Sequence, residues 1–120
     1  MGKISLQGIE LIAKIGVHKQ EHTIGTKCLV DIELGISLKK PGESDKIAHT
    51  IDYEIVLSVV KKCLKNKYNL LEGAARAIGQ ELITLFPEVS RIKISMHKIK
   101  PLLEANVAEV VVEWLYPEDY

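Results

Sequence analysis

The sequence has little of several residue types, and each shortage excludes a class of protein. Two cysteines in 120 residues, Cys28 and Cys63, are too few for a disulfide scaffold, and without CxxC spacing they do not indicate zinc or redox chemistry. Neither sign of charge is in excess, because 16 Lys and Arg balance 16 Asp and Glu, so bulk charge gives no hold on nucleic acid or an anionic membrane. No apolar run is long enough for a membrane span or a signal peptide, which predicts a cytoplasmic protein.

Aromatic residues are scarce as well. One Trp, one Phe and four Tyr leave a core that must be built largely from aliphatic side chains. A length of 120 residues predicts a single domain over 1–120, large enough to bury a core without metal or disulfides. Zero net charge gives weak repulsion between copies, which suits a chain that assembles with itself.

The first third of the chain predicts two antiparallel strands. Apolar residues alternate over residues 4–17, and a one-residue change of phase at Gly8 indicates a β-bulge. A polar loop at 18–25 ends in Gly, and a second alternation follows over 28–38.

The rest of the chain predicts two helices and then two more strands. A polar connection at 39–50 contains turn-forming residues, after which the apolar period becomes helical over 55–64. A second amphipathic stretch over 71–85 is stopped by Pro87. Alternation then returns over 92–96 and 108–114.

These elements predict an α+β fold, a four-stranded antiparallel sheet with two helices on one face. The second face of the sheet is expected to be partly apolar, because Ile12, Val107 and Val111 fall outside the main apolar rows. Such a face predicts a surface that another subunit covers.

Lys98 stands out in the third strand. Its parity is that of Ile94 and Met96, so the alternation that buries apolar side chains turns an ammonium the same way. Two interpretations are open: a lysine that snorkels at a strand end, or a partly desolvated lysine that acts as a general acid and base. Lys100 shares the parity and remains a second candidate.

Three further polar residues are candidates for a site. Glu72 follows Asn69 by three residues, which is typical of a capping box, but a carboxylate at a helix start can also bind an amidine-like edge of a ligand. Glu21 lies in the first loop, where a charge is unremarkable. Tyr53 opens the first helix and is either a core residue or a hydroxyl that relays a proton.

Other catalytic motifs find little support. His18 and His22 have the spacing of metal ligands on a helix but fall in a loop, so a zinc site is weakly supported. No GxGxxG, P-loop or GxSxG pattern is present, which leaves dinucleotide binding, phosphate cradling and serine hydrolysis without a motif.

Several segments together resemble the dihydroneopterin aldolase family, and the resemblance covers nearly the whole chain. The NLLE and SD…DY pieces are its most specific parts, and the segments that carry it are LQGIELIAKIGVHKQEHTIG, SDKIAHTIDYEIV, NLLEGAARAI, ISMHKIKP and ANVAEVVVEW. It implies the tunnelling fold, in which four subunits form a barrel, two rings stack as a homo-octamer, and active sites lie between neighbouring subunits.

The resemblance also implies a reaction and a set of roles. The reaction is retro-aldol cleavage of 7,8-dihydroneopterin, a small-molecule pterin, to 6-hydroxymethyl-7,8-dihydropterin and glycolaldehyde in folate biosynthesis, with no metal, cofactor or lysine Schiff base. Lys98 matches the general acid and base, Tyr53 the tyrosine that assists from the adjacent subunit, and Glu21 the loop glutamate that completes the site. Glu72 matches the carboxylate that binds the pterin edge, and Leu71 would add a backbone contact.

Three rival functions stay open at this stage. The first is an epimerase acting at the 2'-carbon of dihydroneopterin or its triphosphate, which would share the cleavage step. The second is a pterin-binding oligomer without catalysis, and the third is a zinc-dependent enzyme of the same fold, similar to pyruvoyl-tetrahydropterin synthase. Product analysis separates the first, the behaviour of Lys98 variants the second, and zinc content the third.

Overall fold

A computed structural model describes residues 2–101 and 103–120 of the chain. These residues form four strands, four short to medium α-helices and one 3-10 turn. In chain order they are β1 (Gly2–Ala13), α1 (Lys19–Thr23), β2 (Thr26–Ile36), α2 (Lys39–Ser44), η1 (Ile47–His49), α3 (Tyr53–Cys63), α4 (Leu71–Leu85), β3 (Arg91–Ile99) and β4 (Glu109–Tyr116).

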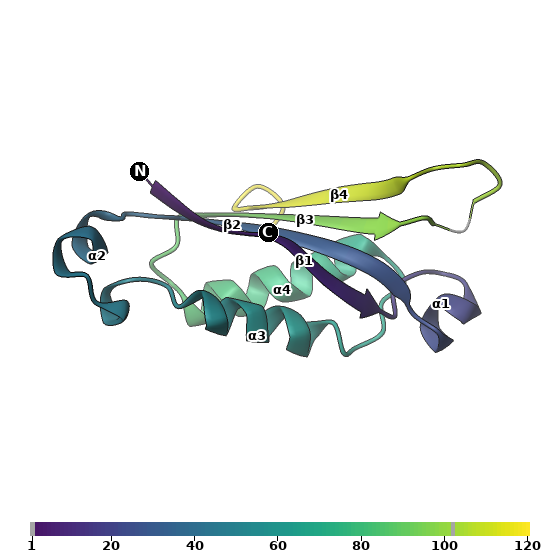
Figure 1. Cartoon of the computed structure of the whole chain (residues 1–120), viewed down its shortest axis with the longest axis horizontal. Helices are drawn as coiled ribbons and strands as arrows, with labels where there is room; N and C mark the ends of the chain where they lie inside the picture. Colours follow the sequence, from purple (N-terminus) through teal and green to yellow (C-terminus); the bar gives the residue numbers. More distant parts are fainter. Residues whose placement is uncertain (1, 102) are drawn as a thin grey trace.

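The sheet is antiparallel throughout, and its strands lie in the order β1-β2-β3-β4. Helices α3 and α4 lie side by side under one face, and no helix of the described residues covers the other face (Figure 1). The predicted fold class and element order are therefore confirmed.

The bulge predicted in the first strand is present. The pairing register of β1 with β2 shifts between Leu6 and Ile9, and Gly8 there has φ 72°, a conformation that glycine adopts without a Cβ clash. The amide of Gly8 donates a 2.6 Å hydrogen bond to Oδ1 of Asp31 on the next strand. The amide of Gly8, which lies outside the regular pairing of β1 with β2, is thus satisfied by the side chain of Asp31.

The core lies between the sheet and the two long helices and is almost entirely aliphatic. Alternate residues of β2 and β3 point into it, and α4 supplies small residues that let the helix approach the sheet. Trp114 of β4 packs against Gly79 of α4, where a Cβ would overlap the indole ring. The fully buried residues of this core include Val30, Ile32, Leu34, Ala74, Ala75, Ile78, Leu82, Ile94 and Met96.

Three local predictions were incomplete or wrong. The first strand ends at Ala13 rather than residue 17, because Ile15 turns under the sheet and makes a lone bridge to Tyr68. The loop at 18–25 contains α1, and the connection at 39–50 contains α2 and η1. Pro41 falls in the first turn of α2, where a missing N–H costs no helical hydrogen bond.

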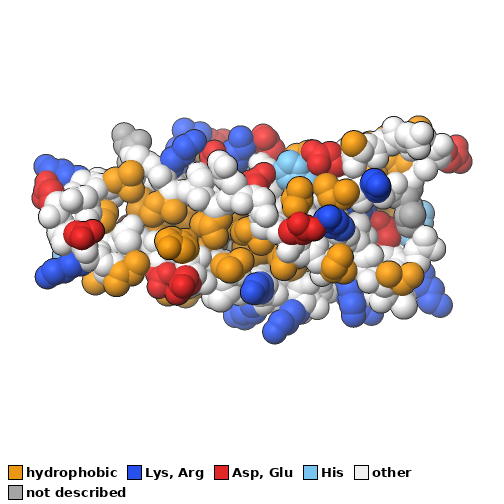
Figure 2. Space-filling view, viewed as in Figure 1, with side chains coloured by type: hydrophobic (Ala, Val, Ile, Leu, Met, Phe, Trp, Pro, Cys, Tyr) orange, Lys and Arg blue, Asp and Glu red, His pale blue; other side chains and the backbone are white. Residues whose placement is uncertain are grey.

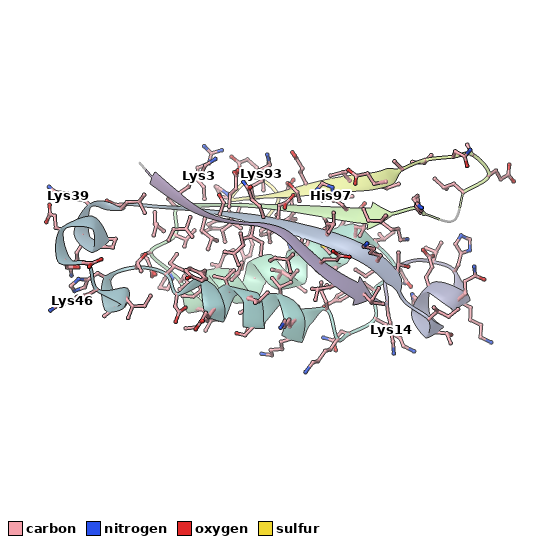
Figure 3. The ribbon with its side chains drawn as sticks, viewed as in Figure 1. Lys3, Lys14, Lys39, Lys46, Lys93 and His97 are labelled. Carbon is pink, nitrogen blue, oxygen red and sulfur yellow. The ribbon has the colours of Figure 1, made fainter. Side chains whose placement is uncertain are left out.

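The uncovered face of the sheet is mixed rather than apolar. Ion pairs cross it between neighbouring strands, Lys3 with Glu33 at 3.1 Å and Lys93 with Glu113 at 3.4 Å. Figure 3 shows Lys3, Lys93 and His97 pointing away from the helices on this face. Ile12 and Val111 are the large hydrophobic side chains that the described residues expose on this face. Both lie toward the end of the sheet where β3 ends, so the face is partly apolar at that end.

A second apolar surface lies along the edge of the molecule. The inward side chains of β1 are only half-buried, because β1 is an edge strand and the helices pack chiefly under its neighbours. Figure 2 shows hydrophobic side chains in a band along the middle of this view, in the region that lies between β1 and α3 in Figure 1. Within the described residues, no helix is long and apolar enough to cross a membrane.

Candidate active site

Four of the five predicted site residues line one cavity at the end of the sheet. The cavity has a volume of about 330 Å³ and lies where β3, the start of α4 and the loop around α1 meet. Lys98, Glu21, Leu71 and Glu72 all contribute to its wall. Residues from three separate segments of the chain thus converge on this cavity.

Lys98 is the cation of the cavity. It follows Met96 on the inward row of β3, and its side chain is 14% exposed. Its Nζ lies 2.6 Å from Oε2 of Glu21, whose side chain is only 4% exposed, so the two form a buried ion pair. The side chain of Lys98 therefore points inward, as its parity in the alternation predicts.

Lys100 is placed differently. It lies beyond the end of β3, is exposed, and has φ 47°, which turns the chain out of the strand. It lines a neighbouring cavity of about 280 Å³ rather than the one that holds Lys98. Geometry thus favours Lys98 over Lys100 as the residue that meets a ligand bound against Glu72.

Glu21 is held as a carboxylate by its hydrogen bonds. Burial alone would raise the pKa of this carboxyl, but the hydrogen bonds from Lys98 and the backbone of His18, with the charge of Lys98, bring the pKa below its ordinary value. The backbone N–H of His18 donates to Oε1 at 3.1 Å, while Lys98 occupies Oε2. Both oxygens are therefore engaged and the carboxylate has a fixed orientation.

The loop that carries Glu21 is shaped by residues that were not predicted to matter. A Cβ on Gly16 would overlap the Glu21 carboxylate, and Gly16 has φ 151°, so glycine makes room for the acid. His22 closes the loop through its Nε2, which lies 2.5 Å from the carbonyl oxygen of Gly16 and 3.2 Å from that of Tyr68. The three-residue spacing of His18 and Glu21, typical of a helix start, was the available signal for α1.

Glu72 and Leu71 stand at the start of α4. The capping box predicted from Asn69 is wrong: the N-cap residue is Leu70, which has no side-chain acceptor, and Glu72 falls at the second helical position. Glu72 is exposed toward the cavity, near amides that favour a carboxylate. The N–H of Leu71 is among those that a helix leaves without an internal partner, so it can donate to a ligand.

Tyr53 is not brought to this cavity by its own chain. It is the first residue of α3, and its side chain is 61% exposed. The start of α3 is anchored by Asp52, whose Oδ1 accepts a 2.9 Å hydrogen bond from the amide of Glu54. Helix α3 runs from that point toward the end of the molecule where β3 ends (Figure 1), so Tyr53 lies at the end of α3 that is away from Lys98.

The thiols and histidines near the site do not form a ligand set. Burial raises the pKa of Cys28, the pairing partner of Lys98 in β2, to about 11, so it stays a neutral thiol. His22 is taken up by backbone carbonyls. Across residues 2–101 and 103–120, no three His, Cys, Asp or Glu side chains cluster as metal ligands do.

Comparison with known proteins places the chain beside a described family. Residues 4–114 match the family model described as FolB, dihydroneopterin aldolase. A dihydroneopterin aldolase of Streptococcus pyogenes serotype M3 is 33% identical over 114 residues, which cover 94% of this chain and 96% of that protein.

Solved structures agree with this match. A FolB protein of Vibrio cholerae superposes with a TM-score of 0.83 at 27% identity, covering 95% of this chain and 97% of that one. An E. coli dihydroneopterin aldolase in complex with neopterin superposes with the same TM-score at 24% identity, covering 95% and 99%. The chain belongs to the dihydroneopterin aldolase family.

Proposed function

We propose that the chain cleaves 7,8-dihydroneopterin by a retro-aldol reaction, releasing glycolaldehyde and 6-hydroxymethyl-7,8-dihydropterin. The observation that carries the proposal is the buried Lys98–Glu21 pair in the same cavity as Glu72 and Leu71. Membership of the family supports the reaction, and makes the chain a carbon–carbon lyase of the folate pathway.

The reaction needs proton transfer and little else. The substrate ring contains an imine between N5 and C6, which accepts the electrons of the bond that breaks, so neither a Schiff base nor a metal is required. A base removes the 2'-hydroxyl proton, the bond between the 1' and 2' carbons breaks, and glycolaldehyde leaves. The resulting enamine is then protonated at the 1' carbon.

Lys98 is assigned the proton transfers. Its contact of 2.6 Å with the Glu21 carboxylate stabilises the ammonium that forms when the amine of Lys98 accepts a proton. Glu21 in turn is fixed by His18 and by the space at Gly16. As the amine, Lys98 can therefore take up the hydroxyl proton, and as the ammonium paired with Glu21 it can return a proton to carbon from the same position.

Recognition of the pterin is assigned to the start of α4. The amino-pyrimidinone edge offers two parallel N–H donors, which suit the two oxygens of the Glu72 carboxylate. The backbone N–H of Leu71 adds a donor on the same side. These contacts would hold the ring while its side chain extends toward Lys98, the arrangement that positioning of a reactive group requires.

The site is completed, in this proposal, by Tyr53 of a neighbouring copy. Its exposure and its distance from the cavity along α3 leave it unsuited to act within one chain. The open edges of β1 and β4 and the apolar band beside β1 suit a ring of four copies that closes a barrel, and two such rings would stack as an octamer.

Product analysis tests the proposed reaction. Purified protein incubated with 7,8-dihydroneopterin is expected to release one glycolaldehyde per hydroxymethyl-dihydropterin. Formation of the 2'-epimer alone would make the chain an epimerase, and formation of neither product would leave a binding protein. Chelation is expected to leave the rate unchanged, and borohydride is expected to trap no adduct on a lysine; failure of either would overturn the metal-free, Schiff-base-free route.

A further inference from the structure

A chain of polar contacts crosses all four strands on the face of the sheet that carries no helix. The amide of Gly8 in β1 donates to Oδ1 of Asp31 in β2 at 2.6 Å. The other oxygen of Asp31 lies 3.0 Å from Nε2 of His97 in β3, and Nδ1 of His97 lies 3.1 Å from Oε1 of Glu109 in β4. His97 is the centre of this chain (Figure 3).

The two contacts of His97 require a charged ring. A neutral imidazole has one N–H, so one of its nitrogens would face a carboxylate oxygen with a lone pair. An imidazolium donates to both. Burial by itself lowers the pKa of His97, but its hydrogen bonds to Glu109 and Asp31, with their charges, raise the pKa above its ordinary value.

Other charges on this face are already matched. Lys93 of β3 pairs with Glu113 of β4, Lys3 of β1 pairs with Glu33 of β2, and Lys27 of β2 pairs with Glu10 of β1 at 2.7 Å. Asp31 and Glu109 are the carboxylates that His97 meets on either side. The imidazolium therefore joins β2, β3 and β4 through two diagonal cross-strand pairs.

The position of this clasp links it to the proposed active site. His97 is the residue before Lys98, and the two side chains lie on opposite faces of β3. Glu109 is the first residue of β4, directly after the loop whose Pro101 and Leu103 line the cavity of Lys98. The contact between His97 and Glu109 thus connects the strand that leads into that loop with the strand that follows it.

We propose that protonated His97 is a positioning residue for catalysis. By holding the start of β4 and the end of β3 together from the far face of the sheet, it fixes the backbone that carries Lys98 and the positions of Pro101 and Leu103 in the cavity wall. This inference rests on the proposed role of Lys98. When His97 loses its proton, one carboxylate loses its partner and the end of the sheet loosens.

The test compares kcat and KM of His97→Gln and of a matched control across pH. We expect His97→Gln to lower kcat roughly tenfold at pH ~7 with little change in KM, because a displaced catalytic group slows the chemical step. The control, Lys93→Gln, removes a cation from the same strand and face but away from Lys98, and is expected to keep kcat within about twofold.

The pH profile separates positioning from general stability. In the wild-type protein kcat is expected to decline as pH rises through the pKa of His97, and His97→Gln is expected to lack that decline. Glu109→Gln removes one side of the clasp and should give a similar loss, while the double variant should be no slower than His97→Gln alone. Should His97→Gln fail to fold, Glu109→Gln and Asp31→Asn carry the same comparison.

Two outcomes overturn the inference. The first is a folded His97→Gln variant whose kcat and pH profile match those of the wild type. The second is a double variant in which the kcat losses of His97→Gln and Glu109→Gln multiply. Neither touches the proposed function, which fails instead if the wild-type protein releases no glycolaldehyde.

Discussion

At the scale of single residues, the site is defined by one buried pair and the backbone that makes room for it. Lys98 and Glu21 come from segments far apart in the sequence and meet at 2.6 Å. Gly16 leaves the space that the Glu21 carboxylate fills, and His18 donates to its second oxygen. Substitutions at Lys98, Glu21 or Gly16 therefore act on the same pair, whereas the donor at His18 is its backbone N–H.

Glu21→Gln tests that pair through the pH dependence of stability. Since the folded-state pKa of Glu21 lies below its ordinary value of 4.5, the folded protein binds fewer protons, and the pair stabilises the fold above that value. This contribution is lost as pH falls through the lowered pKa. The free energy of unfolding of wild type minus Glu21→Gln should thus shrink between about pH 6 and pH 3.

The measurement is denaturant unfolding at several pH values, and the same preparations give turnover. Glu81→Gln serves as the control. Oε1 of Glu81 lies 3.2 Å from Nζ of Lys62, so this variant breaks an exposed ion pair that is not part of the cavity. A difference between wild type and Glu21→Gln that stays constant with pH would show that the carboxylate is not stabilised by Lys98.

At the scale of elements, the close approach of α4 to the sheet depends on Gly79. Replacing it by Ala favours the helix by propensity, but the added Cβ would overlap the ring of Trp114. We expect Gly79→Ala to destabilise the protein by about 1–3 kcal/mol, as overpacking of a core does. Thermal unfolding checks this, and Gly73→Ala, where the nearest contact is an ordinary 3.8 Å, is the control.

Elements with a strong hydrophobic period could be predicted from the sequence. The strands, the bulge at Gly8 and the bounds of α4 follow from apolar spacing, and parity alone turned Lys98 inward. The short helices α1 and α2 could not be found this way, because five or six polar residues show no period. The contact of Lys98 with Glu21 was also beyond reach, since it depends on where a loop folds.

At the scale of the whole molecule, one chain holds an incomplete set of predicted site residues. Lys98, Glu21, Leu71 and Glu72 line one cavity, while Tyr53 lies at the other end of α3. Tyr53 is not among the described residues that line that cavity. An assembly that brings Tyr53 of one copy to the cavity of the next would complete the set.

Mixing two inactive variants tests this assembly. Tyr53→Ala and Lys98→Ala are each expected to have low turnover, because each lacks one part of every site. When they are co-refolded in equal amounts, roughly a quarter of the sites should combine an intact Lys98 with an intact neighbouring Tyr53. Glycolaldehyde release is therefore expected to rise above that of either variant alone, and the control is a mixture of Lys98→Ala with Glu72→Ala, which lie in the same cavity.

The recovery has a clear counter-result. A mixture with no more activity than its components, at a solution mass that shows mixed oligomers, would mean that Tyr53 does not serve a neighbouring site. A monomeric solution mass would contradict the assembly itself.

The most direct test of the central claim is turnover by the matched pair Lys98→Ala and Lys100→Ala on 7,8-dihydroneopterin, with pterin binding measured in parallel. Lys98 lies in the cavity against Glu21, whereas Lys100 is exposed beyond the strand. We expect Lys98→Ala to bind pterin while losing roughly 10²–10⁴-fold in kcat, the usual contribution of a general acid and base. Lys100→Ala should stay near the wild type. Full turnover by Lys98→Ala, or a loss confined to Lys100→Ala, would contradict the account.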